Sequence, residues 1–151
     1  FGARNGERIL AFMKTAVISV LLISLVCISI LLTASKTIIL LFIDRHEDWE
    51  TVILATEFVD YVWPLFIFAG VNILISGYLT AIHRPFESGV VAVSRSLVLP
   101  SFLLLMFYFL MPDFLFITAL PVAEGLTFLL AGTIFLNNRP EKIVVEEKYS
   151  S

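Results

Sequence analysis

Charged side chains are scarce in this sequence: they make up 15% of its 151 residues, whereas soluble domains have about 25%. Hydrophobic residues reach 59% of the chain, against about 45–50% in a soluble domain. The formal net charge of -3 offers no excess of positive charge for binding nucleic acid. This balance excludes a disordered chain, most soluble enzymes and a nucleic-acid partner.

Cysteine is nearly absent, and the usual motifs of soluble enzymes are absent altogether. The single cysteine, Cys27, lies in an apolar run, so no intrachain disulfide is possible. The sequence has no zinc-ligand spacing, no phosphate-binding glycine loop and no nucleophile elbow. We therefore predict that the protein is not an enzyme and needs no cofactor. The chain also begins at Phe1 rather than at a methionine, from which we expect a fragment of a longer protein.

Long uncharged runs account for the hydrophobicity. Residues 15–35, 61–82 and 96–112 carry no charge, and Glu124 is the one charged residue within 114–138. A helix needs about 20 mostly apolar residues to cross a bilayer, and these runs lack the alternation of barrel strands. The alternative, four buried helices of a soluble protein, would leave almost no polar surface. We predict an all-α integral membrane protein with four transmembrane helices, at residues 9–34, 53–82, 87–111 and 115–137.

The connections between the runs are consistent with this division. His83, Arg84 and Pro85 predict a short turn, with Pro85 in the first turn of the following helix. Residues 36–43 predict either an extension of the first helix or a segment lying in the membrane interface. Trp49, in the polar loop that follows, is a candidate anchor at the level of the lipid headgroups.

The basic residues are distributed unevenly between the two sides of the membrane. Because successive helices alternate in direction, both ends of the chain and the turn at 83–86 share one side. That side has eight basic residues, whereas the other has Lys36 and Arg45; the eight are Arg4, Arg8, Lys14, Arg84, Arg95, Arg139, Lys142 and Lys148. The positive-inside rule then predicts a multi-pass plasma-membrane protein with both termini cytoplasmic and a cytoplasmic tail at 141–151.

Glu124 is the clearest candidate functional residue, since ionisable groups deep in a membrane are costly. It lies roughly 20 Å from the cytoplasmic end of its helix, and Pro121 is expected to kink the helix beside it. Arg95 is the candidate partner, because its axial offset from Glu124 is roughly 6 Å. The alternative for Arg95 is snorkelling to the interface. Glu124 is either a carboxylate that responds to protons or cations, or a structural acid; pairing with Arg95 would keep it ionised and disfavour a proton carrier.

A polar stripe runs along the second predicted helix. Asn72, Ser76 and Thr80 are spaced four apart and share one face, with Gly70 and Gly77 close by. The stripe is either packing contact between helices or the wall of a cavity that contacts substrate.

Three further residues of this helix are candidates. Pro64 is expected to kink the helix above the stripe. Glu57 and Asp60 lie near its non-cytoplasmic end, where they are either solvated or line an entrance.

Several segments, in this order and spacing, resemble multidrug and toxic compound extrusion (MATE) transporters. Residues 1–9 (FGARNGERI) resemble the cytoplasmic segment between the second and third helices of each six-helix half. Residues 41–44 and 55–61, which flank an acidic loop, look like a helix end and the next helix start. Residues 77–85 look like the next cytoplasmic turn, and residues 120–124 are similar to the last helix in one bacterial branch.

The resemblance implies that residues 1–140 are the C-terminal part of the second lobe of a twelve-helix, two-lobe transporter. The chain would hold helices nine to twelve, with the missing N-terminal helices as its partner. The family exports small cationic or amphipathic compounds by antiport against sodium or protons. Asn72, Ser76 and Glu124 would then face the central cavity, with Arg95 setting the charge state of Glu124. Many members carry an aspartate in helix ten, where residues 69–72 here read Ala-Gly-Val-Asn.

Two other functions are compatible with the sequence. One is export of a lipid-linked precursor or polysaccharide by a transporter of the same superfamily. The other is a self-standing four-helix membrane subunit that scaffolds partners through its glycine faces. The upstream reading frame would distinguish the scaffold from a transporter.

Overall fold

The computed structural model describes residues 6–43, 49–111 and 113–139, and all regular structure within them is helical. The predicted loop and tail at 44–48 and 141–151 lie outside this part of the chain. The helices are α1 (Gly6–Ile39), α2 (Trp49–Val62), α3 (Leu65–Ala81), α4 (Pro85–Val93), α5 (Leu99–Leu110) and α6 (Ala119–Asn137). A π-helical turn, η1 (Ser94–Val98), joins α4 to α5, and a 3-10 segment, η2 (Asp113–Thr118), leads into α6. The predicted all-α architecture is confirmed.

Three helical segments are long and apolar enough to cross a membrane: Ala11–Ile39, Pro85–Leu110 and Leu115–Asn137. A fourth span requires that α2 and α3 be counted together, although they are bent by 57° relative to each other. The bend lies at Trp63 and Pro64, where a kink is predicted, because proline has no N–H and clashes with the preceding turn. Pro64 immediately precedes α3.

The α1 helix continues to Ile39, so the predicted extension beyond residue 34 is helical. Its 34 residues extend over about 51 Å, which exceeds the roughly 30 Å hydrocarbon core of a bilayer. At its far end, the Lys36 Nζ lies 5.8 Å from the centroid of the Trp49 ring at the start of α2. This cation–π contact joins the end of α1 to the start of α2.

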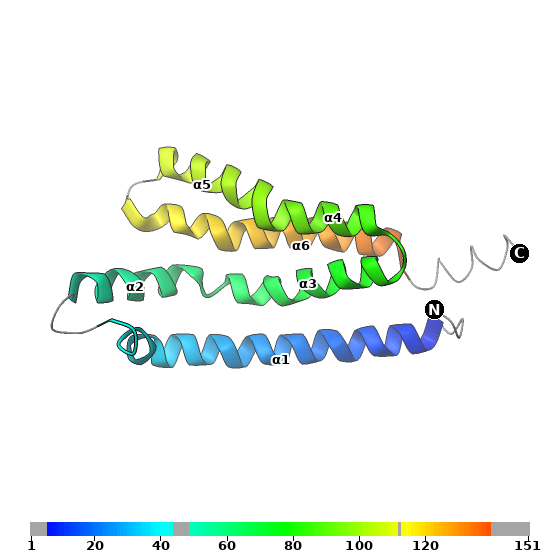
Figure 1. Cartoon of the computed structure of the whole chain (residues 1–151), viewed down its shortest axis with the longest axis horizontal. Coiled ribbons are helices and arrows are strands. Elements are labelled where there is room, and N and C mark those ends of the chain that lie inside the picture. Colours follow the sequence, from blue (N-terminus) through cyan, green and yellow to red (C-terminus); the bar gives the residue numbers. More distant parts are fainter. Residues whose placement is uncertain (1–5, 44–48, 112, 140–151) are drawn as a thin grey trace, which may run out of the picture.

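The helices form layers, with α3 at the centre (Figure 1). The α1 helix lies along α2 and α3 on one side, and α4, α5 and α6 lie on the other side of α3. The start of α1 and the end of α6 lie at the same end of the bundle. Large apolar side chains on α1 remain exposed: Ile18, Leu21, Leu22, Ile23, Leu25, Val26, Ile30 and Leu32. Such a face suits contact with lipid or with further helices rather than water.

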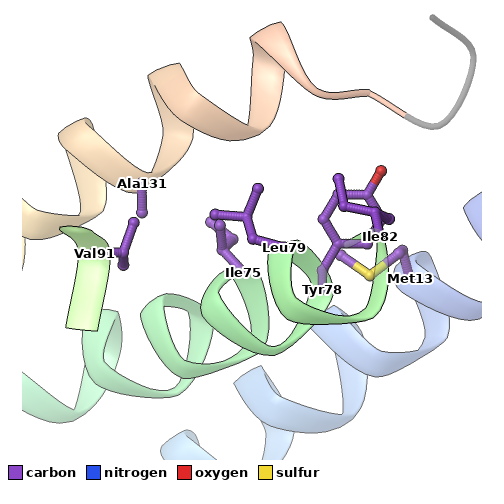
Figure 2. Packing of buried hydrophobic residues seen from close by; sticks show 7 residues of the cluster. All are labelled: Met13, Ile75, Tyr78, Leu79, Ile82, Val91 and Ala131. Carbon is purple, nitrogen blue, oxygen red and sulfur yellow. The ribbon is translucent and has the colours of Figure 1, made fainter. Parts of the chain in front are cut away.

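Two apolar clusters hold the helices together. The larger one, shown in Figure 2, joins α3 to the helices on both sides of it; it contains Met13, Ile75, Tyr78, Leu79, Ile82, Val91 and Ala131. The second cluster joins α5 to α6 through Leu103, Ala119 and Ala123. The alanines allow α6 to pack closely, as small residues do between membrane helices.

At Gly70, α3 packs too closely against α1 to leave room for a side chain. A Cβ atom at this position would overlap the Val20 side chain and lie 3.4 Å from the Ser24 Oγ. Gly77, in contrast, has nothing within 4 Å of the equivalent position. Of the two glycines beside the polar stripe, Gly70 therefore serves helix packing, whereas Gly77 does not.

Gly70→Ala is expected to destabilise the protein by about 1–3 kcal/mol, because the stiff Val20 side chain must move. The matched control, Gly77→Ala, is expected to be neutral or stabilising by up to about 1 kcal/mol, since alanine favours helices. Thermal unfolding of the full chain in detergent measures both. Equal stability of the two variants would contradict this account of Gly70.

The turn between α3 and α4 is a Schellman motif that lacks the usual glycine. The Arg84 N–H donates to the Leu79 carbonyl (2.9 Å) and the His83 N–H donates to the Thr80 carbonyl (3.2 Å), which is the pattern of this motif. His83 has a φ of 61°, in the left-handed region. Pro85 begins α4, as predicted.

His83→Gly is expected to stabilise the protein by about 1 kcal/mol, because glycine has no Cβ to strain at a positive φ. His83→Ala is the matched control, since it removes the imidazole but keeps the Cβ. We expect no gain in its unfolding temperature. A gain of equal size in both variants would assign the effect to the imidazole instead.

Pro121 does not lie within a helical span in the way that the sequence predicts. The chain is 3-10 helical up to Thr118, and α6 begins at Ala119. Pro121 therefore falls in the first turn of α6, where its missing N–H leaves no α-helical hydrogen bond unmade. The change from 3-10 to α-helix lies just before Pro121, and Leu115–Asn137 counts as one span.

Candidate functional site

Glu124 lies in α6 with 6% of its surface exposed, and donors from two other segments hold its carboxylate. The Arg95 Nε donates to Oε1 at 2.7 Å, and the two side chains form an ion pair. The Asn72 Nδ2 donates to Oε2 at 2.7 Å and to the Glu124 backbone carbonyl at 3.0 Å. The structure thus brings together the pair predicted from axial offsets, and it adds Asn72. Charge-assisted bonds of this length fit an ionised carboxylate.

Arg95 reaches Glu124 from the π-helical turn η1. Pro100, just beyond this turn, has no N–H to donate to the carbonyl four residues earlier. The Leu99 N–H donates to the Ser94 carbonyl five residues earlier, which is the π-helical pattern. Such a turn inserts one extra residue and is frequent at functional sites. Sequence reasoning missed this turn, and the signal that could have indicated it is Pro100 within an apolar run.

The polar stripe on α3 divides into two parts with different partners. Asn72 is fully buried and faces Glu124. Ser76 and Thr80 instead contact the Ser88 Oγ on α4, at 2.9 and 2.8 Å. The Ser88 Oγ also donates to the Ser76 carbonyl at 2.9 Å. Ser76 and Thr80 therefore hold α3 against α4. Ser88 belongs to this network, and sequence reasoning missed it.

A cavity of about 380 Å³ lies between α3 and the α4–η1 segment. Its polar lining comes from five side chains: Asn72, Ser76, Thr80, Arg95 and Ser96. Apolar residues such as Ile73 and Val91 complete the wall. Glu124 is not in the lining, because it lies behind Asn72 and Arg95. Asn72 and Ser76, which the sequence places at a cavity, therefore line this cavity. Arg95 lies between the cavity and Glu124.

The other candidate residues lie apart from this cavity. Glu57 and Asp60 are exposed on α2, on the far side of the bend from Asn72. Among the described residues, no three histidine, cysteine, aspartate or glutamate side chains come together as metal ligands. Arg95, Asn72 and Glu124 themselves supply charge pairing and hydrogen bonding at a largely buried position.

Apolar helices of spanning length around a buried ion pair define a multi-pass membrane protein. The model of the family MatE matches residues 1–106, and the chain belongs to this family of membrane transporters. The match includes Asn72 and Arg95 and ends before Glu124. No curated protein and no solved structure matches the sequence.

Proposed function

We propose that the chain takes part in the export of small cationic or amphipathic compounds by antiport against sodium or protons. The observation that carries the proposal is the buried carboxylate of Glu124, held by Arg95 and Asn72 behind a partly polar cavity. A carboxylate in a low-dielectric site attracts cations strongly. Burial of an ionised carboxylate in a membrane costs free energy, so such residues are rare there. Glu124 is for this reason a candidate functional residue.

The proposal includes the placement of the chain within the transporter. Residues 1–140 would form helices nine to twelve, in the second lobe. The transporter would lie in the plasma membrane, with both termini of this chain in the cytoplasm. The apolar exposed face of α1 supports this placement, because it leaves a surface for lipid or for the helices of the missing part.

Efflux by the full-length transporter tests the proposal. Cells that lack their own exporters are loaded with a fluorescent cationic dye, and the rate of dye loss is followed. We expect Glu124→Gln to slow efflux at least tenfold, since it removes the buried negative charge while conserving shape. The control is Glu87→Gln, at an acid in an exposed ion pair with Arg84. Unchanged efflux in Glu124→Gln would remove Glu124 from the mechanism.

A further inference from the structure

The two partners of the Glu124 carboxylate are held with different firmness. Asn72 has no exposed surface and makes two hydrogen bonds to the same residue, one of them to the backbone. Arg95 holds the carboxylate through its Nε alone, and 29% of its side chain is exposed. Arg95 is therefore the partner that can leave without disturbing the packing of α3 against α6.

The guanidinium of Arg95 separates the carboxylate from the cavity. Arg95 lines the cavity, whereas Glu124 does not. Among the described residues, the Asn72 Oδ1 is the one buried side-chain nitrogen or oxygen atom that has no hydrogen-bond partner. The Nη1 and Nη2 atoms of Arg95 also donate to no described acceptor. Because they are not among the buried atoms without a partner, they are accessible. Movement of this side chain would open the carboxylate to the cavity.

We propose that Arg95 is a built-in counter-cation of Glu124, and that a cationic substrate exchanges with it at the carboxylate. The inference rests on the proposed export function and adds the order of events at its binding site. When the cavity is empty, the Arg95 guanidinium pairs with the Glu124 carboxylate. When an organic cation enters, its charged nitrogen takes the place of Arg95, and the guanidinium moves into the cavity or toward the interface.

Charge balance favours exchange over simple addition. The paired Glu124 and Arg95 are neutral together, so an added cation would leave one uncompensated positive charge in a low-dielectric region. Exchange keeps the carboxylate paired throughout. The displaced guanidinium remains ionised, and its long aliphatic stem allows it to reach water while its backbone stays in place. Empty transporters would thus expose no bare carboxylate to the membrane.

The cavity also limits the class of ligand. Its volume of about 380 Å³ lies at the lower end of the range of ligand pockets, about 300–1,000 Å³. The hydroxyl groups of Ser76 and Thr80 are already engaged with Ser88. The site therefore suits a small monovalent organic cation with an apolar body that packs on the exposed side chains of Ile73 and Ala92.

Equilibrium binding of ethidium, a fluorescent monovalent cation, to the purified full-length transporter tests the proposal. We expect Arg95→Gln to bind ethidium about tenfold more tightly than the unmodified protein, because the competing cation is gone and glutamine still donates to Oε1. Glu124→Gln should bind about tenfold more weakly. The double variant Arg95→Gln Glu124→Gln should bind as weakly as Glu124→Gln. Arg84→Gln removes the same charge at an exposed position and should leave binding unchanged.

The direction of the change distinguishes exchange from a supporting role for Arg95. Weaker or equal binding in Arg95→Gln would overturn the proposal. If Arg95→Gln does not fold, Arg95→Lys serves instead, since lysine keeps the charge but loses the planar donor geometry. It should bind ethidium severalfold more tightly, and equal or weaker binding would again overturn the proposal. If the unmodified protein neither binds nor exports organic cations, the proposed function itself fails.

Discussion

Arg95→Leu is expected to lower the free energy of unfolding by about 3 kcal/mol or more. The variant leaves Glu124 with the Asn72 amide as its remaining hydrogen-bond donor and with no opposing charge. An unpaired carboxylate in a buried, low-dielectric position is costly, and this cost exceeds the worth of the intact pair. The double variant Arg95→Leu Glu124→Leu should recover most of the loss, because it removes both charges together.

Unfolding of the full chain in mixed micelles measures these differences. The control is Arg84→Leu, which breaks an ion pair of 3.2 Å whose side chains are 48% and 26% exposed. An exposed pair of this kind contributes about 0–1 kcal/mol. Should Arg95→Leu cost no more than Arg84→Leu, or should the double variant be the least stable of all, the pair would not be desolvated as described.

Asn72→Asp is expected to make stability depend strongly on pH. The variant replaces an amide that donates twice to Glu124 by a carboxylate, so two acids face one guanidinium. The fully ionised arrangement should cost about 3 kcal/mol or more at neutral pH. A single bound proton restores both the charge balance and a donor between the two acids. The folded state then holds a proton that the unfolded chain releases, so stability rises as the pH falls.

Unfolding midpoints of Asn72→Asp between pH 8 and pH 5 test this expectation. The unmodified protein and Asn72→Leu, which loses the donors without adding an acid, serve as references. The difference between Asn72→Asp and Asn72→Leu should shrink steadily toward pH 5. A constant difference across this range would mean that the aspartate does not share a proton with Glu124.

The sequence allowed part of the site to be predicted because membrane depth follows from residue counting. Arg95 and Glu124 lie on consecutive spans joined by a short connection, so their similar depth predicts a contact between them from the sequence alone. The bend at Pro64 follows from the chemistry of proline in the same direct way. In these cases one local rule or one simple count decides the outcome.

Other features depend on helix rotation and packing, which counting does not determine. The contact of Asn72 with Glu124 joins residues 52 positions apart and requires the relative rotation of α3 and α6. Ser88 lies in the first turns of α4, where its sequence context gives no sign of Ser76 opposite. Pro121 lies in the first turn of α6 rather than inside the helix, because the α-helix begins two residues before it, and counting does not fix where a helix starts.

The π-helical turn at Ser94–Val98 also sets the rotational phase of the helix that follows. Each residue of an α-helix advances the chain by about 100° around the axis, so one extra residue turns every later side chain onto another face. With the turn present, Leu103 packs against Ala119 and Ala123 of α6. Loss of a single residue from this turn would carry Leu103 out of the contact and bring a neighbouring side chain in. The length of these five residues therefore determines which face of α5 meets α6 and which face meets its surroundings.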